Sequence, residues 1–460
     1  MTDLSVLTAT ELLAAYSSGD VSPVDVATDL VARVERLEPA IAALYDWRPD
    51  QVLADARVAE GRWHRGEARS LEGVPVTIKE NIATKGVPVP LGTAARELAA
   101  APADAPPAAR MREAGALIAA KTTMPDYGML SSGLSSFHPL TRNPWDTALN
   151  PGGSSAGAGA AAAAGYGPLH VGTDIGGSIR LPASWCGVFG LKPSFGRVPV
   201  DPPYWGRVAG PITRTVADAA LLMRELSRPD PRDGMSLPPA ELPWGAGGHD
   251  LRGLRIGLHL DAGVGLPVEP EVRRAVEEAA QLFEAAGAVI EPVAPFLDRV
   301  MLDGLDTFWR QRAWADIGAL PDASRARILP YILRWAEGGR DLSGADVYRG
   351  LSQMGAMRDA ALAATGRFDL VLSPVAPVPT YPAGMASPID DPEQPFEHIG
   401  FTVPLNFSEQ PAASINAGYT EAGLPIGLQV VGRRFDDLGV LGACAAFETM
   451  RAPQRPWPMA

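Results

Sequence analysis

Cysteine is scarce in this sequence: its 460 residues contain only two, Cys186 and Cys444. Two cysteines cannot build a disulfide framework, and neither belongs to a C-x-x-C pair of the kind that binds structural zinc. The six histidines show no ligand spacing, so neither a metal nor another cofactor is expected. The N-terminus lacks the basic segment and apolar stretch of a secretion signal, and these absences together favour a cytoplasmic location.

Long hydrophobic runs and an excess of positive charge are missing as well. No run of about 18 uncharged apolar residues occurs, so no membrane span is predicted. The 53 Asp and Glu outnumber the 40 Lys and Arg, and the net charge of −13 argues against binding to nucleic acid phosphates. Hydrophobic residues make up 46% of the chain, which is enough for a large buried core.

Hydrophobic periodicity predicts an alternation of helices and short strands. Residues 1–70 are expected to be helical, with Ser22-Pro23 as a helix start signal. Further helices are expected at 155–164, over 272–283 and through most of 300–365. Short apolar strands are predicted at 74–78, 117–120, 254–258, 289–290, 369–373, 411–417 and 425–431. The Gly- and Pro-rich stretches 131–153 and 227–250 are expected to be loops. This alternation implies an α/β layer fold.

Two glycine-rich segments carry serines, PGGSSAG at 151–157 and GTDIGGSIR at 172–180. Successive backbone N–H groups in such turns point the same way and can hold an oxyanion. A serine hydroxyl is a poor nucleophile without a base, and His170 is the only histidine near either segment. A lysine can serve when burial lowers its pKa, and Lys79 ends the strand predicted at 74–78.

These segments belong to a longer series of motifs through which the chain resembles amidase signature enzymes. The matching motifs are GVPVTIKEN (73–81), NPWD (143–146), the two glycine-serine segments, CGVFGLKP (186–193), GPITRTVAD (210–218), QPAAS (410–414) and GLPIGLQ (423–429). One glycine-serine segment alone is a weak signal. All the motifs together occur in order and at the spacing of the family, over nearly the whole chain.

The resemblance implies a fold class and a domain organisation. Residues 1–460 are expected to form a single large α/β domain, with a mixed central β-sheet covered by helices on both faces. Residues 1–70 are expected to form an N-terminal helical lobe, and residues 71–220 the catalytic core.

The resemblance also implies site residues, carried over by position. The lysine of the family falls on Lys79 as base, its bridging serine, which follows a cis peptide, on Ser154 as proton relay, and its nucleophile on Ser178. These two serines are 24 positions apart, as the family pattern requires.

Other parts of the site follow from the same comparison. The oxyanion hole is expected to use the amides of Ile175, Gly176, Gly177 and Ser178. The supporting residues are expected to be Ser155, Asp174 and Arg180, of which the last two are predicted to form an ion pair. Gly128 and Met129 correspond to a pocket wall.

The reaction implied is a two-step acyl transfer that cleaves C–N bonds other than peptide bonds, with ester or carbamate cleavage as a side activity. The expected partner is a small molecule, and the chain is expected to act as a monomer or homodimer. Trp309, Trp314 and Trp335, and the lack of an obvious charged anchor, favour an apolar or aryl substrate. The alternative is the glutaminase subunit of a tRNA-dependent amidotransferase, which works with a partner chain. The short segment 201–207 before Gly210 argues against it.

Two other motif readings are weaker. Residues 153–157 fit G-x-S-x-G, which would make Ser155 the nucleophile of an α/β-hydrolase. Gly157, Gly159 and Ala162 resemble a dinucleotide-binding fingerprint. Neither follows a predicted buried strand, as both motifs require.

The chain departs from the family pattern at two places. Ala156-Gly157 stands where members usually have two glycines, and residues 137–142 lack the usual glycine. The methyl group of Ala156 is expected to narrow the space near the relay serine. The second departure follows residues 127–131, which correspond to the pocket wall, so that loop is expected to suit an unusual acyl group.

Overall fold

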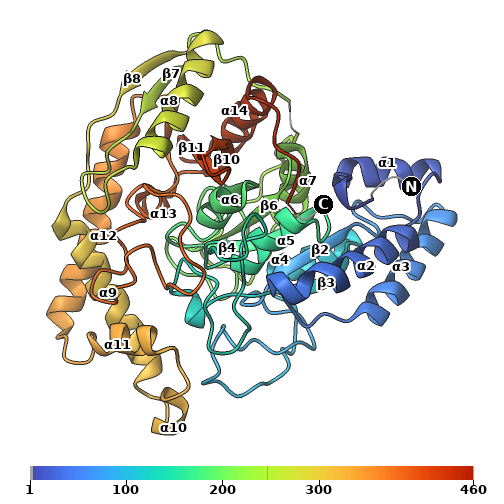
Figure 1. The fold of residues 1–460 in the computed structure, drawn as a ribbon, viewed down its shortest axis with the longest axis horizontal. Coiled ribbons are helices and arrows are strands. Elements are labelled where there is room, and N and C mark those ends of the chain that lie inside the picture. Colours follow the sequence, from blue (N-terminus) through green and yellow to red (C-terminus); the bar gives the residue numbers. More distant parts are fainter. Residues whose placement is uncertain (1–3, 246, 459–460) are drawn as a thin grey trace.

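A single β-sheet runs through the computed structural model, which describes residues 4–245 and 247–458 (Figure 1). Its eleven strands lie in the order β1-β3-β2-β4-β6-β5-β10-β11-β9-β7-β8. They are β1 (Leu44–Tyr45), β2 (Pro75–Lys79), β3 (Leu117–Thr122), β4 (Leu169–Asp174), β5 (Phe189–Lys192), β6 (Val208–Thr213), β7 (Arg255–Leu258), β8 (Val289–Pro292), β9 (Leu370–Pro374), β10 (Ala412–Tyr419) and β11 (Pro425–Gly432).

Both strand directions occur within this sheet. Strand β2 pairs in parallel with β3 and β4, and β7 pairs in parallel with β8 and β9. The middle of the sheet, from β4 through β6, β5, β10 and β11 to β9, is antiparallel. The predicted mixed sheet is therefore confirmed.

Fourteen α-helices surround the sheet in the described part of the chain. They are α1 (Ala9–Ser18), α2 (Pro23–Ile41), α3 (Pro49–His64), α4 (Pro106–Ala114), α5 (Ala156–Ala164), α6 (Arg180–Cys186), α7 (Val216–Leu226), α8 (Pro270–Ala285), α9 (Arg299–Ile317), α10 (Asp322–Arg325), α11 (Pro330–Glu337), α12 (Gly344–Thr365), α13 (Pro404–Phe407) and α14 (Asp437–Met450). Two short 3-10 helices, η1 (Leu4–Val6) and η2 (Asp126–Gly128), complete the set.

The helices cover both faces of the sheet, as predicted. Helices α7, α8 and α14 pack on one face, where Val76, Val171 and Val430 join their side chains in the main core. Helices α5 and α6 pack together on the other face, where Ala158, Ala183 and their neighbours form a tighter core of small residues. Small side chains let these two helices approach the strands closely.

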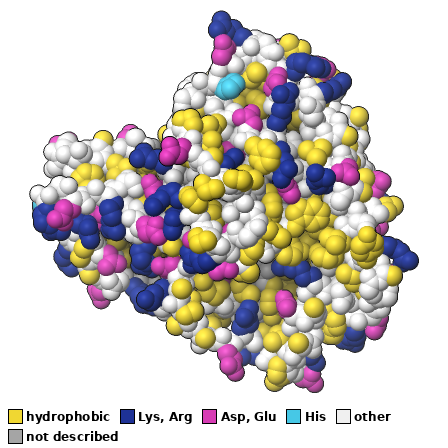
Figure 2. All heavy atoms as spheres, turned by 180° about the vertical axis from the view of Figure 1, so that it is seen from behind, with side chains coloured by type: hydrophobic (Ala, Val, Ile, Leu, Met, Phe, Trp, Pro, Cys, Tyr) yellow, Lys and Arg dark blue, Asp and Glu magenta, His cyan; other side chains and the backbone are white. Residues whose placement is uncertain are grey.

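The two ends of the molecule differ in surface character. Seen from behind, Lys, Arg, Asp and Glu are interspersed over the lobe of α1–α3, whereas hydrophobic side chains gather toward the end that contains α9 to α12 (Figure 2). None of the described helices is both long and apolar enough to cross a bilayer.

Local signals explain several boundaries. Ser22 caps α2, because its side chain accepts the Asp25 N–H while the Asp25 carboxylate accepts the Ser22 N–H. The predicted strands at 74–78, 117–120 and 425–431 are present within one or two residues.

Four strands and five helices were not predicted from the sequence. They are β1, β4, β5, β6, α4, α6, α7, α13 and α14. Strand β4 contains Gly172, and β6 contains Gly210 and Pro211, which are depleted from strands by local propensity. Pairing with neighbours in the middle of the sheet outweighs that local preference.

Candidate active site

Strand β2 places Lys79 on the face of the sheet that packs against α5. Side chains alternate along a strand, so Val76 and Ile78 enter the main core while Lys79 points the other way. Lys79 is fully buried. Its Nζ lies 2.8 Å from Ser154 Oγ and 3.0 Å from Thr173 Oγ1, so both hydroxyls satisfy the amine.

The surroundings of Lys79 favour a neutral amine. Burial, together with the positive charge of Arg207, lowers the pKa of Lys79 to about 7, while the carboxylates of Asp174 and Glu80 oppose the shift. A large share of neutral amine is therefore present at neutral pH. A neutral amine has a lone pair that can take a proton from a hydroxyl.

Ser154 and Ser155 lie between the lysine and the second glycine-serine segment. The peptide bond Gly153–Ser154 is cis. Ser155 is the residue before α5, yet its side chain does not cap that helix. Instead its N–H donates to the Ser178 carbonyl at 3.2 Å, and its Oγ donates to the Thr173 carbonyl at 3.2 Å. Ser155 thus joins the two glycine-serine segments, and Ser154 is left facing Lys79.

Ser178 sits in the turn between β4 and α6 and lines a cavity. Its side chain is 9% exposed, so it is reached only through that cavity. Gly128 lines the same cavity, and a Cβ added there would lie 3.4 Å from Ser154 Oγ. The cavity therefore lies close to Ser154, although Ser154 is not one of its lining residues.

The backbone amides of this turn divide into two groups. The Gly177 N–H donates to Asp174 Oδ1 at 2.9 Å. The prediction that the Gly177 N–H belongs to the oxyanion hole is wrong for this structure, because the Asp174 carboxylate already accepts that N–H. Among the described residues, the N–H groups of Ile175, Gly176 and Ser178 have no hydrogen-bond acceptor, so they remain available to an oxyanion.

A buried ion pair fixes the shape of the turn. Arg180 Nη2 donates to Asp174 Oδ1 at 2.9 Å, and both side chains are fully buried. Although burial opposes the shift, the charge and hydrogen bonds of Arg180 hold the pKa of Asp174 well below its usual range. Arg180 also donates to Asn406 Oδ1 at 2.7 Å and to Gln429 Oε1 at 2.9 Å. The predicted ion pair is present, and it ties the turn to α13 and β11.

The cavity wall is largely apolar, with one charged exception. Gly128 and Met129, predicted as pocket wall, do line the cavity. The other lining residues include Leu130, Ile175, Gly176, Trp309, Arg312, Phe396 and Ile399. The expectation of an uncharged pocket is wrong, because Arg312 from α9 also contributes.

The model of one protein family, Amidase, matches residues 25–441. The chain belongs to the amidase signature family. It is 34% identical to a glutamyl-tRNA(Gln) amidotransferase subunit of Chloroflexus aurantiacus over 99% of both chains. It is 33% identical to an acylamidase of Rhodococcus erythropolis over 99% of this chain and 97% of the relative. Among solved structures, a bacterial aryl acylamidase of the amidase signature enzymes superposes with a TM-score of 0.89 at 32% identity, covering 96% of each chain.

Three residues of this amidase signature site were not predicted from the sequence. Thr173 is the second hydroxyl on Lys79, and Asn81 donates to the same Oγ1 at 3.2 Å. Both lie inside motifs noted in the sequence, one residue before Asp174 and two after Lys79, and only the fold shows their contact. Arg312 has no motif around it, so no sequence signal marked it.

Two further features noted in the sequence can now be placed relative to the cavity. Residues 137–142 do not line the cavity, and His138 Nε2 instead lies 2.9 Å from Glu80 Oε2. Of the three tryptophans, Trp309 lines the cavity while Trp314 and Trp335 do not. Trp335 is buried and its Nε1 donates to Asp306 Oδ1 at 2.8 Å.

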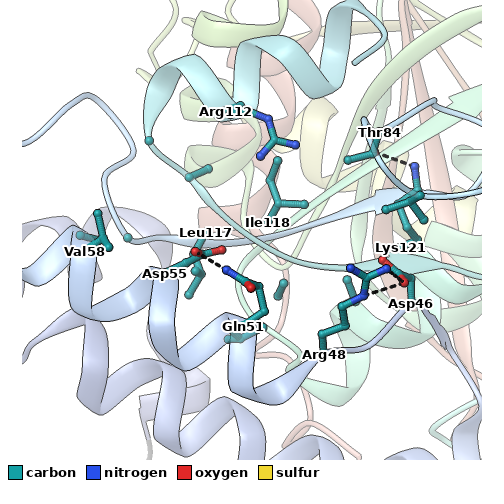
Figure 3. Close-up of a pocket in the computed structure, with 18 of the residues that line it drawn as sticks. Asp46, Arg48, Gln51, Asp55, Val58, Thr84, Arg112, Leu117, Ile118 and Lys121 are labelled. Atoms are coloured by element: carbon teal, nitrogen blue, oxygen red, sulfur yellow. Dashed lines mark hydrogen bonds and ion pairs between the residues drawn. The ribbon is translucent and has the colours of Figure 1, made fainter. Parts of the chain in front are cut away.

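A second hollow lies away from these serines, between α3 and the edge of β3 (Figure 3). Asp46 and Arg48 form an ion pair there, and Gln51 donates to Asp55 at 2.8 Å. Lys121, at its inner end, donates to Thr84 Oγ1 at 2.8 Å. The hollow is largely polar, its lining residues include no serine, cysteine or histidine, and Thr84 is the hydroxyl beside Lys121.

Proposed function

We propose that this amidase signature protein is a serine amidohydrolase that cleaves the amide bond of a small molecule through an acyl-enzyme on Ser178. In this proposal Ser154 relays the proton and Lys79 is the base. The observation that carries the proposal is the buried pair of Lys79 Nζ and Ser154 Oγ at 2.8 Å, next to the cavity that Ser178 lines. All three groups lie within residues 71–220, which we propose as the catalytic part of the domain.

The first half of the reaction forms the acyl-enzyme. Ser178 Oγ attacks the amide carbonyl carbon while its proton passes to Ser154 Oγ, whose own proton passes to neutral Lys79 Nζ. The negative charge on the carbonyl oxygen is held by the free N–H groups of Ile175 and Gly176. The C–N bond then breaks, and the proton returns from Lys79 through Ser154 to the leaving amine.

The second half repeats the same proton path with water. Water attacks the acyl carbon, its proton passes through Ser154 to Lys79, and Ser178 leaves with a proton returned along that path. Esters and carbamates present the same carbonyl to Ser178, so we propose them as side substrates. We also propose that the protein is cytoplasmic, in keeping with free and buried Cys186 and Cys444, and that it acts as a monomer or homodimer.

The second candidate is the glutaminase subunit of a tRNA-dependent amidotransferase. It is favoured by the 34% identity to an amidotransferase subunit over nearly the whole of both chains. Glutamine carries an α-ammonium group, which a binding site normally pairs with a carboxylate. None of the residues that line the cavity of Ser178 is an Asp or Glu. The α-ammonium group of glutamine therefore has no carboxylate partner among these lining residues, which is why we place this candidate second.

The test is the release of 4-nitroaniline from a panel of 4-nitroanilides, with the Ser178→Ala variant as control. The proposal expects release that depends on Ser178 without any added chain. Ammonia release from glutamine is measured in parallel, with and without amidotransferase partner chains. Glutamine turnover that requires those chains, together with inert anilides, would support the second candidate instead.

A further inference from the structure

One arginine, Arg312, lines the active-site cavity, and a second, Arg207, lies near enough to lower the pKa of Lys79. Arg312 of α9 lines the cavity together with Ser178 and Trp309. Arg207 precedes β6 and is half-buried. Among the described residues neither guanidinium forms an ion pair, and the Arg207 side chain donates only to the Pro202 carbonyl, at 3.2 Å.

Tyr204 contacts both arginines, one through its ring and the other through its backbone. The Arg312 guanidinium stacks over the Tyr204 ring, 4.2 Å from its centroid. The backbone N–H of Arg207 donates to the Tyr204 carbonyl at 2.9 Å. Burial lowers the pKa of Arg207, and the positive charge of Arg312 lowers it further, so the two guanidinium groups lie near each other. The charge of Arg207 in turn lowers the pKa of Lys79.

A neighbour on the same helix, Arg310, provides a contrast. Arg310, two residues before Arg312, pairs with Asp306 at 2.8 Å and with Glu393 at 3.3 Å. It is a structural arginine that the protein neutralises itself. Arg312 points to the cavity instead and is exposed. Two unneutralised guanidinium groups repel each other, and an anion between them removes that repulsion.

We propose that Arg312 and Arg207 bind a carboxylate of the substrate, so that the preferred substrates are amides that also carry a carboxylate group. Two guanidinium forks match the two oxygens of a carboxylate. The apolar wall made by Met129, Trp309 and Phe396 then holds the carbon chain or ring between that carboxylate and the scissile bond. This inference rests on the proposed function and names its substrate class.

Two matched pairs of chromogenic amides test the inference. In the first pair, the mono-4-nitroanilide of glutaric acid is compared with 5-methylhexanoyl-4-nitroanilide, in which an isopropyl group replaces the carboxylate. In the second pair, the carboxylate is on the leaving amine: N-acetyl-5-amino-2-nitrobenzoate is compared with N-acetyl-4-nitroaniline. Wild type is expected to favour the carboxylate member of at least one pair by about tenfold or more in kcat/KM.

The variants show whether the arginines cause that preference. Arg312→Gln and Arg207→Gln should each reduce the ratio within the pair about tenfold, and Arg312→Lys should keep part of it. Arg340→Gln is the matched control, because Arg340 also stacks on an aromatic ring, that of Trp314, at 4.8 Å from its centroid. Arg340→Gln should leave the ratio unchanged. A preference for the neutral member of both pairs, or a ratio untouched in both Gln variants, would overturn the inference.

Binding separates this inference from the proposed function. If no amide is hydrolysed, the proposed function has failed, and the same four compounds are titrated calorimetrically into the Ser178→Ala variant. Tighter binding of a carboxylate compound, lost when Arg312→Gln is added, would still support the anion site. Equal binding of the carboxylate and neutral compounds would overturn it.

Discussion

Two lysines on neighbouring strands, Lys79 on β2 and Lys121 on β3, share burial and charge state but not surroundings. Both are buried, and burial lowers the pKa of each to about 7. In the sheet, Lys79 is paired with Thr122 and Ile78 with Lys121. Because side chains alternate along a strand, the two lysines leave the sheet on opposite faces.

The partners of the two amines differ, and the difference bears on the proposed role of Lys79 as base. Lys121 donates to the Ile82 carbonyl, which can only accept, and to the Thr84 hydroxyl at the inner end of the polar hollow (Figure 3). Lys79 meets two hydroxyls, Ser154 and Thr173, and a hydroxyl can also give a proton. Under the proposed mechanism, Lys79 differs from Lys121 because the hydroxyl of Ser154 lies close to the cavity that Ser178 lines, whereas no serine lines the polar hollow beside Lys121 and Thr84.

The sharpest way to break this comparison is to replace each lysine by methionine, which keeps its length and apolar stem. Lys79→Met is expected to lower kcat/KM on a 4-nitroanilide by about 10³-fold or more, because Ser178 then has no base. Lys121→Met should remain within about threefold of wild type. Thermal unfolding of both variants checks that each is folded. Equal losses in the two variants would contradict the distinction.

The two neighbouring serines, Ser154 and Ser155, test which hydroxyl passes the proton to Lys79. Ser154→Ala should lower kcat/KM by about 10²- to 10³-fold, because the proton path between Ser178 and Lys79 is cut. Ser155→Ala removes the two Oγ hydrogen bonds to Thr173, one donated to its carbonyl and one accepted from its N–H, and should cost about tenfold or less. Steady-state kinetics on one anilide measures both. A larger loss for Ser155→Ala would make Ser155 the relay.

The pH dependence of kcat/KM reports the charge on Lys79. Activity requires the neutral amine, so kcat/KM should fall as the pH drops below about 7, the folded pKa of Lys79. The charge of Arg207 helps to lower that pKa, so Arg207→Gln should move this acidic limb to higher pH, by up to about one pH unit. Lys121→Met should leave the limb in place. A limb that stays fixed in Arg207→Gln would argue against Lys79 as its origin.

The smallest expected effect is on stability. An unfolded lysine has a pKa of about 10.4, so between about pH 7 and 10 the unfolded chain binds more protons at these lysines than the folded one. Stability should therefore gain from rising pH over that window through Lys79 and Lys121 alike. Urea midpoints at pH 7 and pH 9 should differ less in either Met variant than in wild type. An unchanged difference in both would contradict the lowered pKa values.

The sequence predicted the parts of the site that lie inside short motifs. Lys79 lies 2.8 Å from Ser154, the Asp174–Arg180 ion pair is present, and the role of Ser178 as the nucleophile stays a prediction. The motifs could not show which backbone N–H groups already have a hydrogen-bond acceptor within the protein. The Gly177 N–H is taken by Asp174, a contact set by the shape of the turn and not by residue type.

The cavity itself was the least predictable part. Its wall combines Gly128 and Met129 with Trp309 and Arg312, which come from a helix far along the chain. Such neighbours depend on tertiary packing, which hydrophobic periodicity does not encode. In the fold, strands with an apolar β-branched run, such as β2, were predicted, whereas β6, with Gly210 and Pro211 in its middle, was not.

The most direct test of the central claim is the labelling of Ser178 by an organophosphonyl fluoride, followed by peptide mass spectrometry across a range of pH. The account predicts that the label is found on Ser178, that its rate rises through a pKa near 7, and that the rate collapses in Lys79→Met but persists in Lys121→Met. A label on another serine, or equal labelling rates in Lys79→Met and wild type, would contradict the account.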